Sequence, residues 1–225
     1  MYRKLVHLAV LSLTAALAVA AQAAPAGNES ARQILLQAGA NTPQRAALVE
    51  EGRKAAFFCA NCHGEQGVSR YGEVPNLAGQ HPAYVLTQIE AFLAGTRKDA
   101  FMQGLMKVLS ERDKAAIAVH YASSPALQPK ASAGTGAKLY AQYCAHCHQA
   151  DAGGAETFPR LAGQQSEYLR RSLQRYLTQS GERFYAPMTA AVIQLGEKNI
   201  DAVVEYLSGA HAAPGAVRST AANGR

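Results

Sequence analysis

Sulfur is scarce in this sequence, and long apolar runs are almost absent. The 225 residues include only four cysteines and four methionines. Beyond the first 24 residues, no apolar stretch approaches the roughly 20 residues that a membrane-spanning helix needs. No run of residues alternates between apolar and polar side chains, as half-buried β-strands do. These absences argue against further membrane spans and against a sheet, and they make each sulfur-containing residue informative.

The start of the chain has the features of a secretory signal peptide. Arg3 and Lys4 form a charged beginning, residues 8–20 are apolar, and Ala21-Gln22-Ala23 is a small-residue cleavage site. An uncleaved membrane anchor is the alternative, but the apolar run is short for that role. We therefore expect residues 1–23 to be removed and the mature protein to be soluble, exported and periplasmic.

All four cysteines belong to two identical units, Cys59-x-x-Cys62-His63 and Cys144-x-x-Cys147-His148. Exported proteins usually pair their cysteines as disulfides, but a disulfide does not require a histidine after each pair. A zinc ribbon places its two pairs roughly 15–20 residues apart, far closer than these, and a thioredoxin-like pair needs a βαβ context. Covalent haem attachment explains the whole unit, because two thiols add to the haem vinyl groups and the histidine binds iron.

The sequence therefore predicts two covalently bound haem c groups. The residues expected to hold them are the thiols of Cys59, Cys62, Cys144 and Cys147 and the iron ligands His63 and His148.

The two units lie within a longer internal repeat. The segment PNLAGQHPAYVLTQIEAFLAG from Pro75 matches PRLAGQQSEYLRRSLQRYLTQ from Pro159, and the offset between the copies stays at 84 to 86 residues. Self-similarity at a fixed period indicates a duplicated domain. The expected divisions are a signal peptide (1–23), an N-terminal extension (24–45), a first domain (46–123), a linker rich in Pro, Gly, Ser and Ala (124–136), a second domain (137–209) and a disordered tail (210–225).

Both copies are predicted to be helical, which makes the expected fold all-α. Apolar residues recur at helical spacing from Val85 to Leu93 and from Leu169 to Leu177. Thr42 and Pro43 are predicted to open a helix that runs into Cys59, and residues 110–113 resemble a capping box. A short helix is also expected from Glu29 to Ala38. Each domain is near the lower size limit for a self-sufficient core, to which a buried haem would add apolar bulk.

The iron of each haem needs a sixth ligand or an open position. Met188 is the only methionine of the second domain, whereas the first has Met102 and Met106. Met188 precedes Leu195 by seven positions, and Met102 precedes Leu109 by seven, so Met102 is the match. Methionine is often a core filler, which describes Met106 well. For Met102 and Met188 we predict iron ligation, since His/Met is a common c-type pair.

The remaining histidines are interpreted as structural, because none is matched by a histidine in the other copy. They are His81, His120, His146 and His211, of which His120 is the best substitute ligand if a methionine fails. Pro75 and Pro159 follow the ligand histidines by 12 and 11 residues. Their carbonyls could accept the second ring N–H of each histidine, although both prolines could equally be ordinary loop residues.

Two such units, each followed by Pro-x-Leu-Ala-Gly-Gln, an amphipathic helix and a methionine, resemble the di-haem cytochrome c4 family. The resemblance covers about residues 53–208. It implies two tandem class I cytochrome c domains, each wrapped around its haem and related by a pseudo-twofold axis. It further implies His63 and His148 as proximal ligands, Met102 and Met188 as distal ligands, and hydrogen bonds from the histidines to the carbonyls of Pro75 and Pro159.

The chain departs from that pattern in several places. It has the N-terminal extension, and Gln149 stands where Gly64 follows the first histidine. Phe101 precedes the first methionine, whereas Pro187 precedes the second. None of these differences removes a predicted ligand, but each could mark a specialised member with a dedicated partner.

Net charge does not favour nucleic acid as a partner. The formal charge of +6 comes from 22 basic and 16 acidic residues, and it falls to +4 when Arg3 and Lys4 are removed. Four haem propionates would bring the protein close to neutrality. Arg170, Arg171 and Arg175 cluster on one predicted helix, either as a solvated face or as a surface that steers an acidic partner or pairs with propionates.

Two classes of function fit these features. The first is an electron carrier of a respiratory chain, with partners such as a quinol-oxidising complex, a dehydrogenase or a terminal oxidase, and contact with membranes only through such partners. The alternative is the cytochrome subunit of a periplasmic dehydrogenase, or a di-haem enzyme of the peroxidase or thiosulfate-oxidising type. Because no acid–base pair or nucleophile is recognisable and both copies keep His and Met, we interpret the protein as a carrier and not an enzyme.

We predict that the two haems differ in reduction potential, because the repeats differ most in the loops around them. A redox titration of the holoprotein should require two potentials. A titration curve that fits a single potential for both haems would contradict this prediction.

Overall fold

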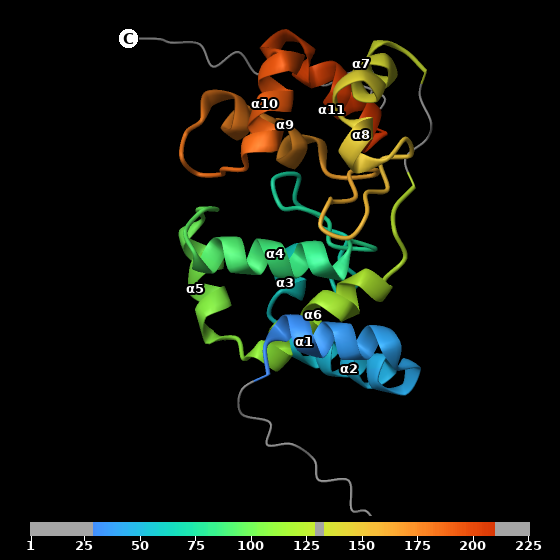
Figure 1. The fold of residues 1–225 in the computed structure, drawn as a ribbon, viewed down its shortest axis with the longest axis vertical. Helices are drawn as coiled ribbons and strands as arrows, with labels where there is room; N and C mark the ends of the chain where they lie inside the picture. The colour runs from blue at the N-terminus through green and yellow to red at the C-terminus, as the bar shows by residue number, and fades with distance from the viewer. Residues whose placement is uncertain (1–28, 129–132, 210–225) are drawn as a thin grey trace, which may run out of the picture.

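The computed structural model describes residues 29–128 and 133–209, which form two helical units stacked one on the other (Figure 1). The elements of the first unit are α1 (Ala31–Ala40), α2 (Thr42–Ala55), α3 (Ala60–His63), α4 (Pro82–Leu93), α5 (Ala100–Val108) and α6 (Glu111–Ser123). Those of the second are α7 (Thr135–Tyr143), α8 (Ala145–His148), α9 (Ser166–Thr178), α10 (Ala186–Leu195), the 3-10 turn η1 (Glu197–Asn199) and α11 (Ile200–Ser208).

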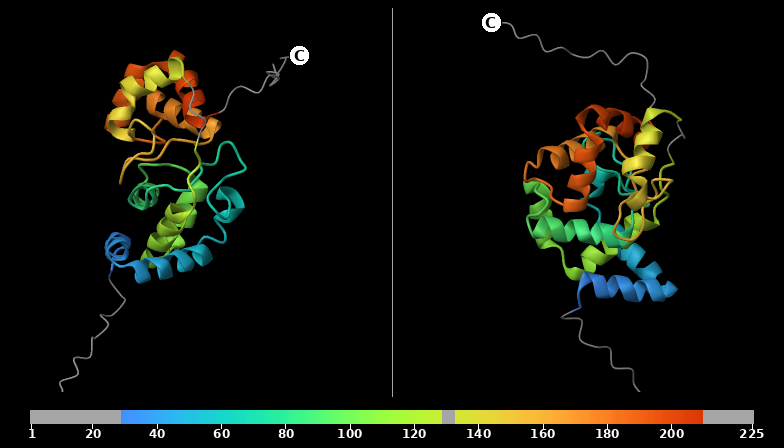
Figure 2. Two further views of the ribbon diagram at one scale, coloured as in Figure 1. Left: turned by 90° about the vertical axis from the view of Figure 1, so that its right-hand side faces the viewer. Right: turned by 45° about the horizontal axis from the view of Figure 1, so that its top comes forward.

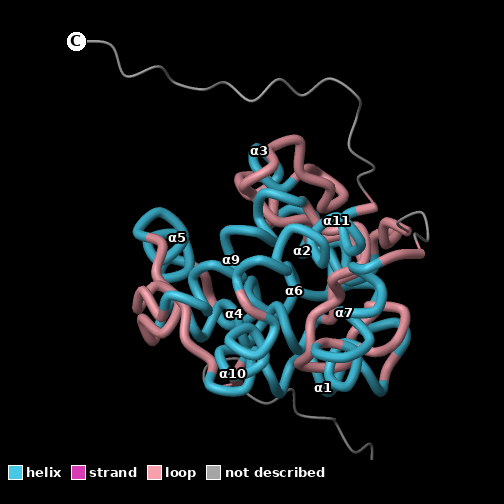
Figure 3. Tube along the Cα trace, turned by 90° about the horizontal axis from the view of Figure 1, so that it is seen from above, coloured by secondary structure: helices cyan, strands magenta, loops and turns pink. Residues whose placement is uncertain are grey.

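The described part of the chain contains helices and loops but no β-strand beyond isolated bridges, which confirms the all-α prediction (Figure 3). Within those same ranges, no helix is long and apolar enough to cross a membrane. The predicted signal peptide (1–23) and tail (210–225) lie outside the described residues.

The duplication is visible in the order of the helices, because α2 to α6 correspond to α7 to α11. Loops of the two units meet between the helical layers (Figure 2). Each unit has its own core. Leu86, Ile89 and Val119 belong to the first, and Leu169 and Val203 to the second.

A glycine marks the crossing of the first and last helices of each repeat. Gly52 on α2 faces Ala116 on α6, where an added Cβ would lie 2.0 Å from the Ala116 carbonyl oxygen. Gly136 on α7 faces Ala202 on α11, with a corresponding distance of 2.1 Å. The two backbones touch at both crossings, so only a residue without a side chain fits there.

The N-terminal extension folds as helix α1 and covers the first unit. Its buried face consists of Ala31, Ile34 and Ala38, which pack into the first core. The Arg32 guanidinium forms an ion pair with Glu90 on α4 at 2.5 Å. The second unit has no equivalent of this helix among its described elements.

Four sequence-based details of this region need correction. The short N-terminal helix covers 31–40 instead of 29–38, and the side chain of Asn41, not Thr42, caps α2 by accepting a hydrogen bond from the Gln44 N–H. The expected boundary between residues 45 and 46 falls inside α2. Helix α2 also ends at Ala55 and does not run into Cys59.

The early end of α2 follows from the length of the repeat. Six residues separate Gly52 from Cys59, whereas seven separate Gly136 from Cys144. With one residue fewer between the crossing and the cysteine, the first copy leaves the helix and reaches Cys59 through a turn. In the second copy α7 continues to Tyr143, directly before Cys144.

The substitution of Gly64 by Gln149 in the second copy leaves the backbone conformation nearly unchanged. Gly64 has φ 79° and ψ 152°, and Gln149 has φ 66° and ψ 159°. This region is strained for any residue with a side chain. The Gln149 carbonyl accepts a hydrogen bond of 2.6 Å from the Tyr140 hydroxyl, which helps to hold the strained turn.

We expect Gly52→Ala to destabilise the holoprotein by roughly 1–3 kcal/mol, because the new methyl group collides with the α6 backbone. The matched control is Gly39→Ala on α1, where nothing lies within 4 Å of the added Cβ. That control should be neutral or stabilising by up to about 1 kcal/mol. Urea unfolding followed by far-UV circular dichroism measures both variants, and equal stability of the two would contradict the assigned crossing.

Candidate functional site

Each Cys-x-x-Cys-His unit forms one short helical turn, α3 in the first domain and α8 in the second. The His63 N–H donates to the Cys59 carbonyl at 2.9 Å, and the His148 N–H donates to the Cys144 carbonyl at 3.0 Å. All four cysteines are free thiols and are partly buried. Because the two pairs lie in separate units, they do not form the four-cysteine site of a zinc ribbon, and no cluster of three or more His, Cys, Asp or Glu side chains occurs in residues 29–128 and 133–209.

The two histidines have the protonation state that an iron ligand requires. His63 and His148 are buried, with 7% and 4% of their surfaces exposed. The Nδ1 of His63 lies 2.9 Å from the Pro75 carbonyl oxygen, and the Nδ1 of His148 lies 3.0 Å from that of Pro159. Burial lowers the pKa of both histidines, so the rings are neutral near pH 7. With Nδ1–H donated to the carbonyl, Nε2 keeps the lone pair that binds a metal.

Free thiols and a neutral, oriented imidazole on the same turn suit covalent attachment of haem. Burial raises the pKa of Cys59, and it raises that of Cys144 to about 11, so these thiols stay protonated until they react. The attachment residues and the histidines thus fit a haem in each domain.

The two predicted methionine ligands occupy the same position in equivalent helices. Met102 is the third residue of α5, and Met188 is the third residue of α10. Both are partly buried, and Asp99 caps α5 by accepting from the Met102 N–H at 3.0 Å. Met106 is only 4% exposed and belongs to the first hydrophobic core, as expected for a core filler.

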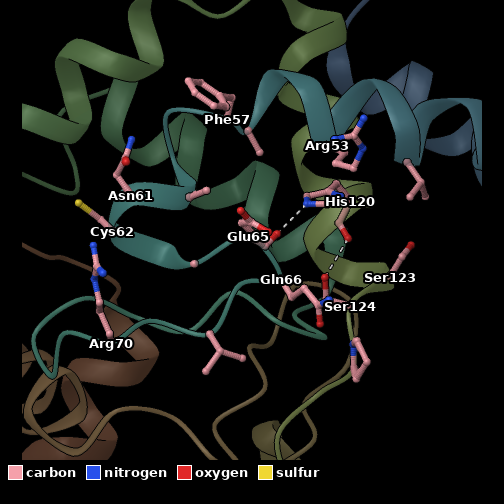
Figure 4. A pocket seen from close by; sticks show the side chains of 16 residues that line it. Arg53, Phe57, Asn61, Cys62, Glu65, Gln66, Arg70, His120, Ser123 and Ser124 are labelled. Carbon is pink, nitrogen blue, oxygen red and sulfur yellow. Dashed lines mark hydrogen bonds between the residues drawn. The ribbon is translucent and has the colours of Figure 1, made fainter.

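The other histidines contact the backbone or solvent. The Nε2 of His120 lies 3.1 Å from the Glu65 carbonyl oxygen, in a groove beside α3 that is also lined by Arg53 and Arg70 (Figure 4). His81 Nε2 lies 2.9 Å from the carbonyl oxygen of Gly153 in the second domain. His146 is exposed, and His211 lies outside the described residues.

The arginine cluster on α9 is largely paired with carboxylates. Arg170 contacts Asp201, Arg171 contacts Glu167 and Arg175 contacts Glu182, at distances of 2.7, 2.9 and 2.5 Å. These pairs favour the interpretation of the cluster as a solvated face.

A different pair of arginines lies between the domains. Arg97 Nη2 donates to the Tyr168 hydroxyl of the second domain at 3.1 Å. In the reverse direction, Arg183 Nη2 donates to the Tyr84 hydroxyl of the first domain at 3.0 Å. Arg97 and Arg183 are also joined by an isolated antiparallel bridge of the backbone. The sequence pattern did not indicate a contact between these two arginines, although each stands five residues before the predicted methionine of its domain.

The charge of this pair is not balanced by carboxylates within residues 29–128 and 133–209. In that part of the chain, neither Arg97 nor Arg183 forms an ion pair. Burial raises the pKa of the Tyr168 hydroxyl, but the positive charges of Arg183 and Arg97 outweigh it and bring the pKa down to about 7. Guanidinium groups bind carboxylates through strong, charge-assisted hydrogen bonds. Their chemistry therefore suits the propionates of a haem.

Comparisons with known proteins agree with this geometry. A family model described as cytochrome c matches residues 133–210. The cytochrome c4 of Pseudomonas aeruginosa is 30% identical over 175 residues, which are 71% of this chain and 87% of that protein. A thiosulfate dehydrogenase electron acceptor from Stutzerimonas stutzeri is 30% identical over 204 residues, covering 82% of this chain and 93% of the relative. The crystal structure of reduced recombinant cytochrome c4 from Pseudomonas stutzeri superimposes with a TM-score of 0.65 at 28% identity, over 72% of this chain and 98% of that one.

The duplicated helical fold, the two attachment turns and these relatives lead to one conclusion. The chain belongs to the cytochrome c4 family and is an electron-transfer cytochrome with two covalently bound haem c groups.

Proposed function

We propose that this cytochrome is an exported, periplasmic carrier that moves electrons from a respiratory donor to a terminal oxidase or a similar acceptor. The observation that carries the proposal is the repetition of the whole ligand arrangement. Each domain has a buried histidine bonded to a proline carbonyl, and each has a methionine at the third position of the equivalent helix. Two six-coordinate haems suit electron transfer, whereas haem catalysis requires an open or exchangeable position.

In this proposal His63 and His148 are the proximal ligands, and Met102 and Met188 are the distal ligands. The carbonyls of Pro75 and Pro159 fix the tautomer and the orientation of the histidine rings. The four cysteine thiols would add to the vinyl groups of the haems. The thioethers formed in this way would tie each haem to the turn that carries its histidine. The haem supplies the change of iron oxidation state, and the protein supplies the ligands and excludes water.

The optical spectrum of the oxidised holoprotein should contain a methionine–iron charge-transfer band of two-haem intensity, and the reduced form should not bind carbon monoxide. Met188→Leu should remove about half of the band and open one haem to carbon monoxide. Met106→Leu is the matched control and should change neither result, because Met106 is in the core. Binding of carbon monoxide to one haem of the unaltered protein would instead indicate an enzyme or a different ligand.

A second candidate is a dedicated electron acceptor for a periplasmic dehydrogenase, such as one that oxidises thiosulfate. The thiosulfate dehydrogenase electron acceptor of Stutzerimonas stutzeri supports it, because that match extends over 82% of this chain, compared with 71% for the Pseudomonas aeruginosa cytochrome c4. In this second candidate the haem chemistry is the same and only the electron donor differs.

The donors can be compared by stopped-flow reduction of the oxidised holoprotein. We expect a quinol-oxidising complex with quinol to reduce it at least tenfold faster than thiosulfate dehydrogenase with thiosulfate. Faster reduction by thiosulfate dehydrogenase with thiosulfate would instead identify that dehydrogenase as the electron donor.

A further inference from the structure

The glutamine that ends the Leu-Ala-Gly-Gln motif of each repeat is buried between the domains. Gln80 is 6% exposed and Gln164 is 7% exposed. A buried amide side chain is costly unless its donors and acceptor find partners. Both glutamines find most of these partners in the opposite domain.

The two glutamines make the same pair of hydrogen bonds in opposite directions. Gln80 Oε1 accepts from the Arg160 N–H at 2.8 Å, and its Nε2 donates to the Arg160 carbonyl at 3.1 Å. Gln164 Oε1 accepts from the Asn76 N–H at 2.7 Å, and its Nε2 donates to the Asn76 carbonyl at 3.0 Å. Each amide therefore binds both backbone groups of one residue across the interface.

That residue follows the proline whose carbonyl bonds the histidine. The N–H of Asn76 belongs to the same peptide group as the Pro75 carbonyl, which accepts from His63. The N–H of Arg160 likewise shares a peptide group with the Pro159 carbonyl, which accepts from His148. A peptide group is planar and rigid, so holding its N–H also fixes the direction of its carbonyl oxygen.

We propose that Gln80 and Gln164 are positioning residues, through which each domain orients the iron-binding histidine of the other. Gln80 acts on His148 through the Pro159–Arg160 peptide, and Gln164 acts on His63 through the Pro75–Asn76 peptide. The inference rests on the proposed ligand roles of these histidines.

The glutamines also influence the electronic state of the histidines. A hydrogen bond accepted from a peptide N–H polarises the group and makes its carbonyl oxygen a stronger acceptor. A stronger acceptor makes the imidazole a more basic ligand, which favours oxidised iron. Loss of the glutamine amide should therefore raise the reduction potential of the haem in the opposite domain.

We expect Gln80 and Gln164 to affect the haem of the opposite domain to different extents. The Asn76 side chain is itself anchored, since its Nδ2 donates to the Gly163 carbonyl at 3.0 Å and its Oδ1 accepts from the Ser69 N–H at 2.8 Å. The Arg160 side chain makes one such bond, from Nη2 to the Leu127 carbonyl at 2.9 Å. Removal of Gln80 should therefore have the larger effect.

The test compares Gln80→Met and Gln164→Met in the holoprotein by redox titration and by the hyperfine-shifted NMR signals of the oxidised haems. Gln80→Met should move the signals of the second haem and raise its potential while the first haem stays unchanged. Gln164→Met should move the signals of the first haem and raise its potential by a smaller amount, while the second haem stays unchanged. Met188→Leu assigns the signals to the two domains.

The matched control is His81→Gln, which removes the neighbouring interdomain bond to Gly153 and introduces the residue that the second copy has at this position. It should change neither haem selectively. If a methionine variant fails to fold, Gln80→Asn, whose side chain is one methylene shorter, replaces it.

Equal changes at both haems, a change at the haem of the mutated domain, or no change would overturn the proposal and leave the glutamines as simple interdomain contacts. The charge-transfer band of the unaltered protein separates this failure from that of the proposed function. An intact band with no crossed effect rejects only the role of the glutamines, whereas a missing band rejects the His/Met ligand set.

Discussion

The hydrogen bond between a buried histidine and a proline carbonyl is the interaction on which each domain is built. It decides which ring nitrogen keeps a lone pair, and it needs a loop that returns the chain to the histidine after 11 or 12 residues. In the first domain the loop is held by Gly67, whose carbonyl accepts from the N–H groups of Leu77 and Ala78. In the second, Ala152 does the same at φ 55°. The loops between the histidine and the Leu-Ala-Gly-Gln motif are therefore structural supports for the histidine that we propose as the iron ligand.

The backbone around the histidine is strained to a different degree in the two domains. All described residues other than glycine with positive φ lie in the second domain, where they are Gln149, Ala152, Glu156 and Gln179. The first domain uses Gly64 and Gly67 at the corresponding turn positions and is also covered by α1. The second domain consequently stores more backbone strain and has fewer helices to oppose it. Such differences around the two proposed ligand sets are one physical source of unequal haem environments.

The sequence was sufficient to predict the helical fold, the duplication and the positions of the attachment turns, because these depend on local patterns. The capping box at Ser110 and the buried role of Met106 are also local features, and the structure contains both. The end of α2 was predicted wrongly, because a one-residue difference between the repeats changes where the helix must stop. The contacts between the domains were not predicted. In the sequence, the residues that make them only recur at matching positions of the two repeats: Gln80 and Gln164, Arg97 and Arg183. Their partners are 71 to 99 positions away in the chain, a distance at which sequence pattern alone does not reveal contacts.

The reciprocal contacts of Gln80 and Gln164 with the opposite domain also limit how a duplicated protein can evolve. In a chain of independent modules, each copy can be exchanged or trimmed without regard to its neighbour. Here the amide that supports one histidine peptide is encoded in the other copy, so a single domain cut from this chain would expose that peptide to water. The pair of domains, and not the individual domain, is therefore the smallest part of the molecule that contains every hydrogen bond of the peptide groups that orient its histidines.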